Sequence, residues 1–147
     1  MIDSKLAPYA AFVLRLSLGL MYLSHALLFK VQMLGIDATA GFFASQGLPG
    51  SPAFTWLIIL LEAVGGVLLI TGVYARLTAV ALLPILIGAT WVHWPNGWVF
   101  VSANGGWEYP VYLIANSIAV YLLGSGAWTL KLPFLPQIKL PGEGAAA

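Results

Sequence analysis

Apolar stretches about as long as a lipid bilayer is thick dominate this sequence. One runs from about residue 53 to residue 71 with Glu62 as its only charged side chain, and another, residues 77–94, has no acidic residue, lysine or arginine. A helix needs about 20 mostly apolar residues to cross the hydrocarbon core. Only 7% of the 147 residues are charged, against roughly 25% in soluble domains. We therefore predict an integral membrane protein.

Four membrane spans are predicted, which makes the fold an all-α four-helix transmembrane bundle. The spans cover about residues 8–29, 53–71, 77–94 and 109–123, so residues 1–132 form one domain. A short interfacial helix is expected over residues 38–45. Residues 133–147 form a proline-containing tail whose end is predicted to be disordered.

Two local features constrain how the spans connect. The link at residues 72–76 is so short that the second and third spans must form an antiparallel hairpin. Pro84 lies inside the third span, where its missing N–H and its ring are expected to kink the helix. The apolar run at the N-terminus is too long for a signal peptide, so we expect a retained first span.

Basic residues outside the spans predict the orientation. With four spans, Lys5, Arg76, Lys131 and Lys139 share one side, and Lys30 alone lies on the other. Because cytoplasmic flanks carry the excess of lysine and arginine, both termini are predicted on the cytoplasmic side.

Composition excludes several classes of chemistry. There is no cysteine, so the chain by itself cannot supply a thiol nucleophile, a disulfide or an iron–sulfur ligand. The net charge is only +1, and no basic patch interleaved with aromatic residues is present, so nucleic-acid binding is not expected.

Charged residues at membrane depth need partners. Arg15 and Glu62 are predicted to form an ion pair, because an arginine side chain can bridge the difference in their depths. A structural clasp between the first two spans is favoured over a role in proton relay or substrate positioning. Gly65 and Gly66 follow Glu62 and allow a neighbouring backbone to approach closely.

A second polar group is predicted near the outer ends of the spans. His25 lies on the inward face of the first span together with Tyr22, His93 ends the third, and Glu108 begins the fourth. Four interpretations stay open. They are haem ligation by the two histidines, a divalent metal site, a proton-exchanging end to a quinone pocket, and simple residence at the membrane interface.

The quinone interpretation assigns a role to each of these side chains. His25, His93 and Glu108 would exchange protons, and aromatic residues would cover the flat quinone ring. The predicted cofactor-binding residues are Tyr22, Trp91, Trp94, Trp107 and Tyr112. No residue is assigned as a metal ligand in this interpretation.

Several runs of this sequence, in this order and spacing, are similar to the DoxX family of small bacterial and archaeal membrane proteins. These runs are RLSLGLMYLSH at residues 15–25, GFFASQGLP at 41–49, EAVGGVLLITG at 62–72, NGGWEYP at 104–110 and GSG at 124–126. The resemblance covers about residues 8–130. It implies a four-helix membrane bundle in the cytoplasmic membrane of a prokaryote. The family's characteristic polar residues fall on Arg15, His25, Lys30, Glu62, Arg76, His93 and Glu108.

The resemblance also implies a link to membrane oxidoreductases, because the family includes membrane subunits of archaeal thiosulfate:quinone oxidoreductase. Two positions depart from the family pattern. Ala26 replaces the glycine that often follows the histidine of the first span, and Lys131 stands in the tail where many members have an acidic residue.

Three functions follow as hypotheses. The first is a membrane subunit of an oxidoreductase system, with a quinone held near the outer leaflet. The second is a non-catalytic anchor that recruits a soluble or peripheral enzyme, with the tail as its handle. The third and least favoured is a small-solute transporter, which would need a homo-oligomer because four short spans leave little room for alternating access.

Overall fold

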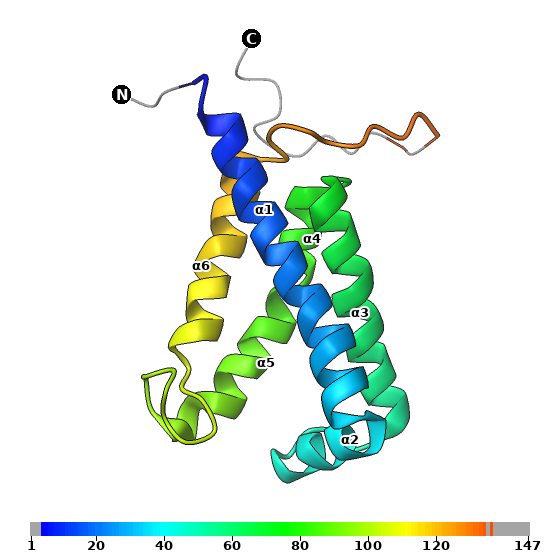
Figure 1. The fold of residues 1–147 in the computed structure, drawn as a ribbon, viewed down its shortest axis with the longest axis vertical. Helices are drawn as coiled ribbons and strands as arrows, with labels where there is room; N and C mark the ends of the chain where they lie inside the picture. Colours follow the sequence, from blue (N-terminus) through cyan, green and yellow to red (C-terminus); the bar gives the residue numbers. More distant parts are fainter. Residues whose placement is uncertain (1–3, 135, 137–147) are drawn as a thin grey trace.

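The computed structural model describes residues 4–134 and residue 136, and within them all regular structure is helical (Figure 1). The helices are α1 (Ala7–Leu23), η1 (Ser24–Leu34), α2 (Ile36–Ser45), α3 (Pro52–Thr71), α4 (Ala75–Ala81), α5 (Leu83–His93), η2 (Trp94–Asn96) and α6 (Glu108–Leu123). The all-α prediction is confirmed. Most of the predicted tail, residue 135 and residues 137–147, lies outside the described residues.

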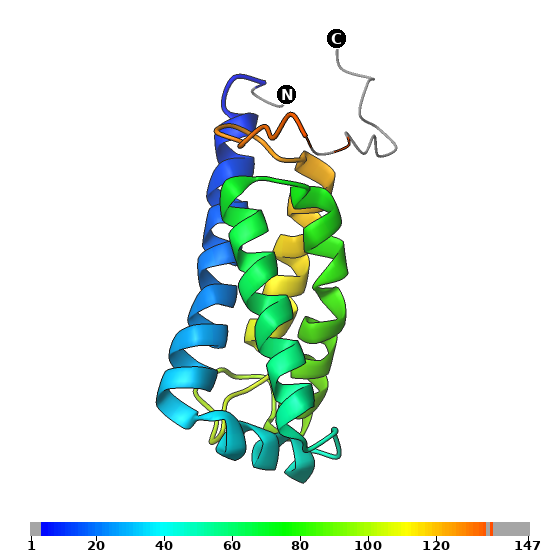
Figure 2. The same cartoon turned by 90° about the vertical axis from the view of Figure 1, so that its right-hand side faces the viewer.

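Within the described residues, three helical segments are long and apolar enough to cross a membrane. They are Ala7–Leu34, Pro52–Thr71 and Ala75–Asn96. At 16 residues α6 is shorter than these three, and it packs against α1, α4 and α5. The long helices run side by side in both views (Figures 1 and 2), as expected for a multi-pass membrane protein.

The first helix extends further than the sequence predicts. It continues past residue 29 to residue 34, since the π-helix Ser24–Leu34 follows α1 without interruption. Gly35, with a φ of 81°, then turns the chain into α2. The expected interfacial helix is thus present as Ile36–Ser45, and its Phe43 ring lies 5.6 Å from the ring of Phe54 at the start of α3.

Residues at each end of α3 explain where the helix begins and where it ends. At the start, Ser51 Oγ accepts a hydrogen bond from the N–H of Phe54, and Pro52 takes the first helical position. At the end, Gly72 adopts a left-handed conformation with φ of 77°, which is a common glycine C-cap. The chain reverses over residues 72–74 and enters α4, which packs against α3. The predicted hairpin is confirmed.

The predicted disturbance at Pro84 is a break between α4 and α5 at Leu82. Because α4 packs against both α3 and α6 whereas α5 packs against α6, the break redirects this part of the chain from α3 towards α6 (Figure 1). The core that results centres on Leu18, Tyr22, Leu69, Leu82 and Val120.

Two glycines set the close contact between α1 and α3. A Cβ added to Gly19 would lie 2.7 Å from the carbonyl oxygen of Gly66, and one added to Gly66 would lie 2.9 Å from that of Gly19. The close backbone approach predicted at Gly66 is therefore confirmed. Gly65 faces the side chain of Leu82 instead.

The start of α1, the end of α3 and the segment after α6 meet at one end of the bundle. The N–H of Ala127 donates to the carbonyl of Pro8 at 2.9 Å, and the N–H of Leu130 donates to that of Thr71 at 2.8 Å. The helix α2 and the loop of residues 97–107 lie at the opposite end (Figure 1).

Candidate functional site

A buried ion pair joins η1 to α3. The Nζ of Lys30 donates to both carboxylate oxygens of Glu62, at 2.9 Å and 2.8 Å. Their side chains are only 11% and 5% exposed. Two charges in such a place are stable only because each compensates the other. Lys30 therefore takes the place that the sequence analysis gave to Arg15, and the predicted ion pair between Arg15 and Glu62 is wrong.

The π-helical geometry of η1 explains why Lys30 faces inward. A π-helix has more residues per turn than an α-helix, so residues five apart, such as His25 and Lys30, lie closer to the same face. Thr39 of α2 then holds the end of this turn, because its Oγ1 donates to the carbonyls of Gly35 at 2.8 Å and of Lys30 at 3.4 Å.

Two further polar side chains lie near this pair. Tyr22 is 1% exposed, and its hydroxyl has no hydrogen-bond partner among the described residues. Tyr22 lies one turn after Gly19 on α1 and Glu62 one turn before Gly66 on α3, so the contact between these glycines puts Tyr22 and Glu62 at the same level. His25 follows on η1, which packs against α3. We call Tyr22, His25, Lys30 and Glu62 the polar centre. It unites one predicted proton-exchanging residue, one predicted ion-pair residue and one predicted cofactor-binding residue.

His25 has a defined tautomer in this arrangement. Its Nδ1 lies 3.1 Å from the carbonyl oxygen of Met21. A carbonyl can only accept, so Nδ1 carries the hydrogen and Nε2 is the nitrogen that takes up a further proton. The imidazole also stacks on Tyr109 of α6, with ring centroids 6.4 Å apart.

Arg15 lies away from the polar centre, at the end of the bundle where α3 and α6 end. It is fully buried, and among the described residues its guanidinium donates to backbone carbonyls alone. These belong to Leu69 and Ile70 near the end of α3, and to Ser125, Ala127 and Trp128 after α6. Carbonyls in the last turn of a helix lack helical partners, and the helix dipole makes that end negative. Arg15 therefore joins the end of α3 to the segment after α6 and holds that segment against the bundle.

His93 and Glu108 stabilise the loop of residues 97–107. His93 Nδ1 donates to the carbonyls of Asn104 at 3.1 Å and Gly105 at 3.2 Å. Glu108 Oε1 accepts the N–H of Phe100 at 2.8 Å. The structure thus gives His93 and Glu108 loop partners, whereas His25 contacts Met21 and Tyr109. Within the described residues, no hydrogen bond or ring contact joins the three predicted proton-exchanging residues directly, although Tyr109 and Phe100 lie between His25 and Glu108.

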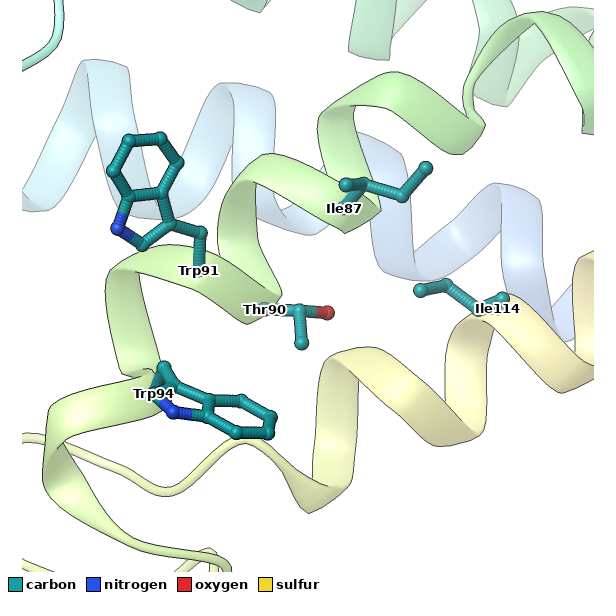
Figure 3. A pocket seen from close by; sticks show the side chains of 5 residues that line it. All are labelled: Ile87, Thr90, Trp91, Trp94 and Ile114. Atoms are coloured by element: carbon teal, nitrogen blue, oxygen red, sulfur yellow. The ribbon is translucent and has the colours of Figure 1, made fainter.

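An apolar pocket of about 320 Å³ opens between α5 and α6. It is lined by Ile87, Thr90, Trp91, Trp94 and Ile114 (Figure 3). Trp91 and Trp94 are 68% and 59% exposed, so the pocket is open on its outer side. Of the predicted cofactor-binding residues, Trp91 and Trp94 line this pocket, and Tyr22 and Tyr112 do not.

Trp107 supports the pocket from behind Trp94. The two indole rings stack with centroids 4.5 Å apart, and Trp98 meets Trp107 edge to face at 4.4 Å. Indole pairs of this kind hold the large rings in place. Trp94, Trp98 and Trp107 therefore form one continuous group of aromatic side chains beside the pocket.

Comparison with known proteins agrees with this architecture. Residues 10–94 match the model of the DoxX family. The chain belongs to the DoxX family. A curated protein of Bacillus subtilis (strain 168), named "Putative oxidoreductase CatD", is 33% identical over 136 residues, covering 91% of this chain and 92% of that protein. No solved structure matches.

The DoxX match contains every residue of the polar centre, as well as Arg15 and His93, and ends before Glu108. Membership of the DoxX family and similarity to that relative support an oxidoreductase-associated role in the membrane. Within the described residues, no three histidine, aspartate or glutamate side chains gather as a metal site would require.

Lys30 is the residue that reasoning from spacing missed. The sequence analysis treated it as the charge that closes the first span. Only the DoxX resemblance placed Lys30 among the characteristic polar residues, and that was the signal that could have identified it.

Proposed function

We propose that this chain is a membrane subunit of an oxidoreductase system that holds a quinone in the pocket between α5 and α6. The observation that carries the proposal is the aromatic wall of that pocket, formed by Trp91 and Trp94 in a DoxX-family chain with an oxidoreductase-named relative. Ligand pockets of this kind are mostly apolar with a few polar groups.

The size and position of the pocket suit a flat apolar ring. Its 320 Å³ is at the small end of ligand pockets, which span roughly 300–1,000 Å³. Both indoles are more than half exposed, so a lipid-soluble quinone could enter sideways from the bilayer. Trp107 behind Trp94 would resist displacement of the wall.

Two polar groups on α5 are suited to the quinone oxygens. Thr90 lines the pocket and donates its hydroxyl hydrogen to the carbonyl of Leu86 at 2.8 Å, so its oxygen is left as an acceptor for a quinol O–H. His93 lies one turn further along α5. Because His93 Nδ1–H donates to the loop, Nε2 is its proton-exchanging nitrogen.

We further propose that α6 is a fourth span and that both termini lie on the cytoplasmic side of a prokaryotic inner membrane. The starts of α1 and α4 and the end of α6 share one end of the bundle, which carries Lys5, Arg76 and Lys131 (Figure 1). Lys30 is buried within the bundle, where it pairs with Glu62, and the positive-inside rule counts basic residues in the loops that flank the spans, so Lys30 weighs little against them. This strengthens the asymmetry on which the orientation depends.

The test of quinone binding is a calorimetric titration of the detergent-purified protein with a short-chain benzoquinone. We expect close to one quinone per chain, with affinity reduced about tenfold by Trp91→Ala, the change that corresponds to ~1.4 kcal/mol. Trp128→Ala is the matched control, because Trp128 is also exposed but packs on Phe12 of α1.

Equal losses in both variants would contradict a site at Trp91, and an absence of binding to the unaltered protein would reject the quinone proposal. In that case the non-catalytic anchor is the better account. A soluble partner should then remain with the membrane when Trp91 is replaced.

A further inference from the structure

Glu62 has hydrogen-bonding capacity that the ion pair does not use. Its two oxygens accept one hydrogen bond each, both from the Nζ of Lys30. A carboxylate offers about four lone-pair positions. A purely structural ion pair at this depth would be more stable with additional donors around the carboxylate.

The hydroxyl of Tyr22 is the second unusual feature. It is buried and has no partner among the described residues, although Tyr22 lies at the level of Glu62 where α1 and α3 approach most closely. A buried unsatisfied hydroxyl is unfavourable and calls for an explanation. A protonated Glu62 would carry an O–H that needs an acceptor, and the Tyr22 oxygen could supply it. The phenol oxygen is therefore able to accept a hydrogen bond from a neutral Glu62.

His25 provides a connection to the surface. It is half-buried on η1, one turn after Tyr22, and its Nε2 is the nitrogen that accepts a proton. The π-helix that brings His25 and Lys30 to one side is a rare structure that occurs frequently at functional sites.

We propose that the polar centre is a proton-exchange site, in which Glu62 takes up a proton by way of His25 and holds it as a neutral acid hydrogen-bonded to Tyr22. The proton on Nε2 of an imidazolium passes to a Glu62 oxygen, bridged by water or by the Tyr22 hydroxyl. Imidazolium and carboxylate become imidazole and carboxylic acid, and no electron moves. This proposal is independent of whether a quinone binds.

The surrounding groups are compatible with this exchange. Lys30 of η1 bonds Glu62, Tyr22 of α1 lies at the level of Glu62 beside the Gly19–Gly66 contact, and Tyr109 of α6 stacks on His25 of η1. The side chain of Lys30 is 11% exposed, and a lysine stem can move its charged end towards water. When Glu62 is neutral, the charge of Lys30 is no longer compensated within the bundle, and this movement would return it to water.

The experiment is infrared difference spectroscopy of the full chain in lipid bilayers during a pH titration. A protonated carboxylic acid has a C=O stretching band that a carboxylate lacks. We expect such a band to grow on acidification, to disappear in Glu62→Gln and to shift in Tyr22→Phe, where the acid loses its acceptor. Asp37→Asn, which alters an exposed carboxylate of α2, is the control that should leave the band unchanged.

Glu62→Gln leaves Lys30 without its anion and could fail to fold. The double variant Lys30→Met/Glu62→Gln removes both charges and keeps the test decidable, because it too must lack the band. A band that persists without Glu62, or no acid band that grows on acidification of the unaltered protein, would show that Glu62 does not exchange protons and overturn the proposal.

Discussion

The Nζ of Lys30 lies 2.8 Å from one carboxylate oxygen of Glu62 and 2.9 Å from the other. Removing one member of a buried pair leaves an uncompensated charge, which typically costs about 3–5 kcal/mol. We expect Lys30→Met to lower the free energy of unfolding by about that much. The double variant Lys30→Met/Glu62→Met should recover most of the loss, because both charges are gone.

Denaturant-induced unfolding in mild detergent would measure these effects. Lys131→Met is the control, because Lys131 is exposed and its loss should change stability by less than about 0.5 kcal/mol. If the single and double variants are equally destabilised, packing of the side-chain stems, and not charge compensation, accounts for the stability that Lys30 contributes.

The contact between Gly19 and Gly66 leads to a second prediction. A Cβ on Gly66 would lie 2.9 Å from the carbonyl oxygen of Gly19, so Gly66→Ala must push α1 and α3 apart. We expect a loss of about 1–3 kcal/mol, the usual effect of overpacking. Gly88→Ala in α5 is the matched control, because its Cβ would meet nothing within 4 Å.

The two substitutions should change stability in opposite directions. Alanine in an open helical position should stabilise α5 by up to about 1 kcal/mol. Thermal unfolding of the two variants side by side would compare them. A Gly66→Ala protein as stable as Gly88→Ala would mean that the helices separate without loss of packing.

A third prediction concerns Arg15, which donates hydrogen bonds to five carbonyls. Arg15→Lys keeps the charge but not the planar fork of five N–H groups. We expect the segment of residues 124–130 to detach from the bundle, with hydrogen exchange at the amides of Ala127 and Leu130 at least tenfold faster. Lys131→Met serves again as control, and unchanged exchange in Arg15→Lys would show that charge alone fastens this segment.

Much of the fold follows from sequence rules that act over short distances. The length and apolarity of residues 53–71 predict α3 almost to the residue, since its ends depend on Ser51, Pro52 and Gly72. The disturbance at Pro84 follows in the same way, because proline has no N–H to give to the helix. These signals are local, so a single sequence contains them.

The partners of the buried charges depend on geometry that the sequence does not display. An α-helical projection turns Lys30 well away from His25, and only the π-helix of η1 brings them together. Arg15 binds carbonyls of residues 125–128, more than 100 positions away, and no side-chain pattern marks a backbone acceptor. Depth alone suggested Glu62 as the partner of Arg15, and depth does not fix which face a side chain occupies.

The last prediction separates a structural role of Glu108 from a chemical one. Glu108 Oε1 accepts the N–H of Phe100 at 2.8 Å across the loop of residues 97–107. Hydrogen bonds to charged groups contribute about 1.5–3 kcal/mol. We expect Glu108→Ala to speed hydrogen exchange at the Phe100 amide by about 10- to 100-fold, since each 1.4 kcal/mol is a factor of ten. Glu108→Gln, which keeps a neutral acceptor, should give a smaller increase.

Ser102→Ala is the control for Glu108, because it alters the same loop and leaves the bond to Phe100 in place. Exchange at Phe100 should be unchanged in that variant. If Glu108→Ala leaves the Phe100 amide as protected as before, the carboxylate does not hold the loop. Its position at the start of α6 would then favour the proton exchange that the sequence analysis assigned to Glu108.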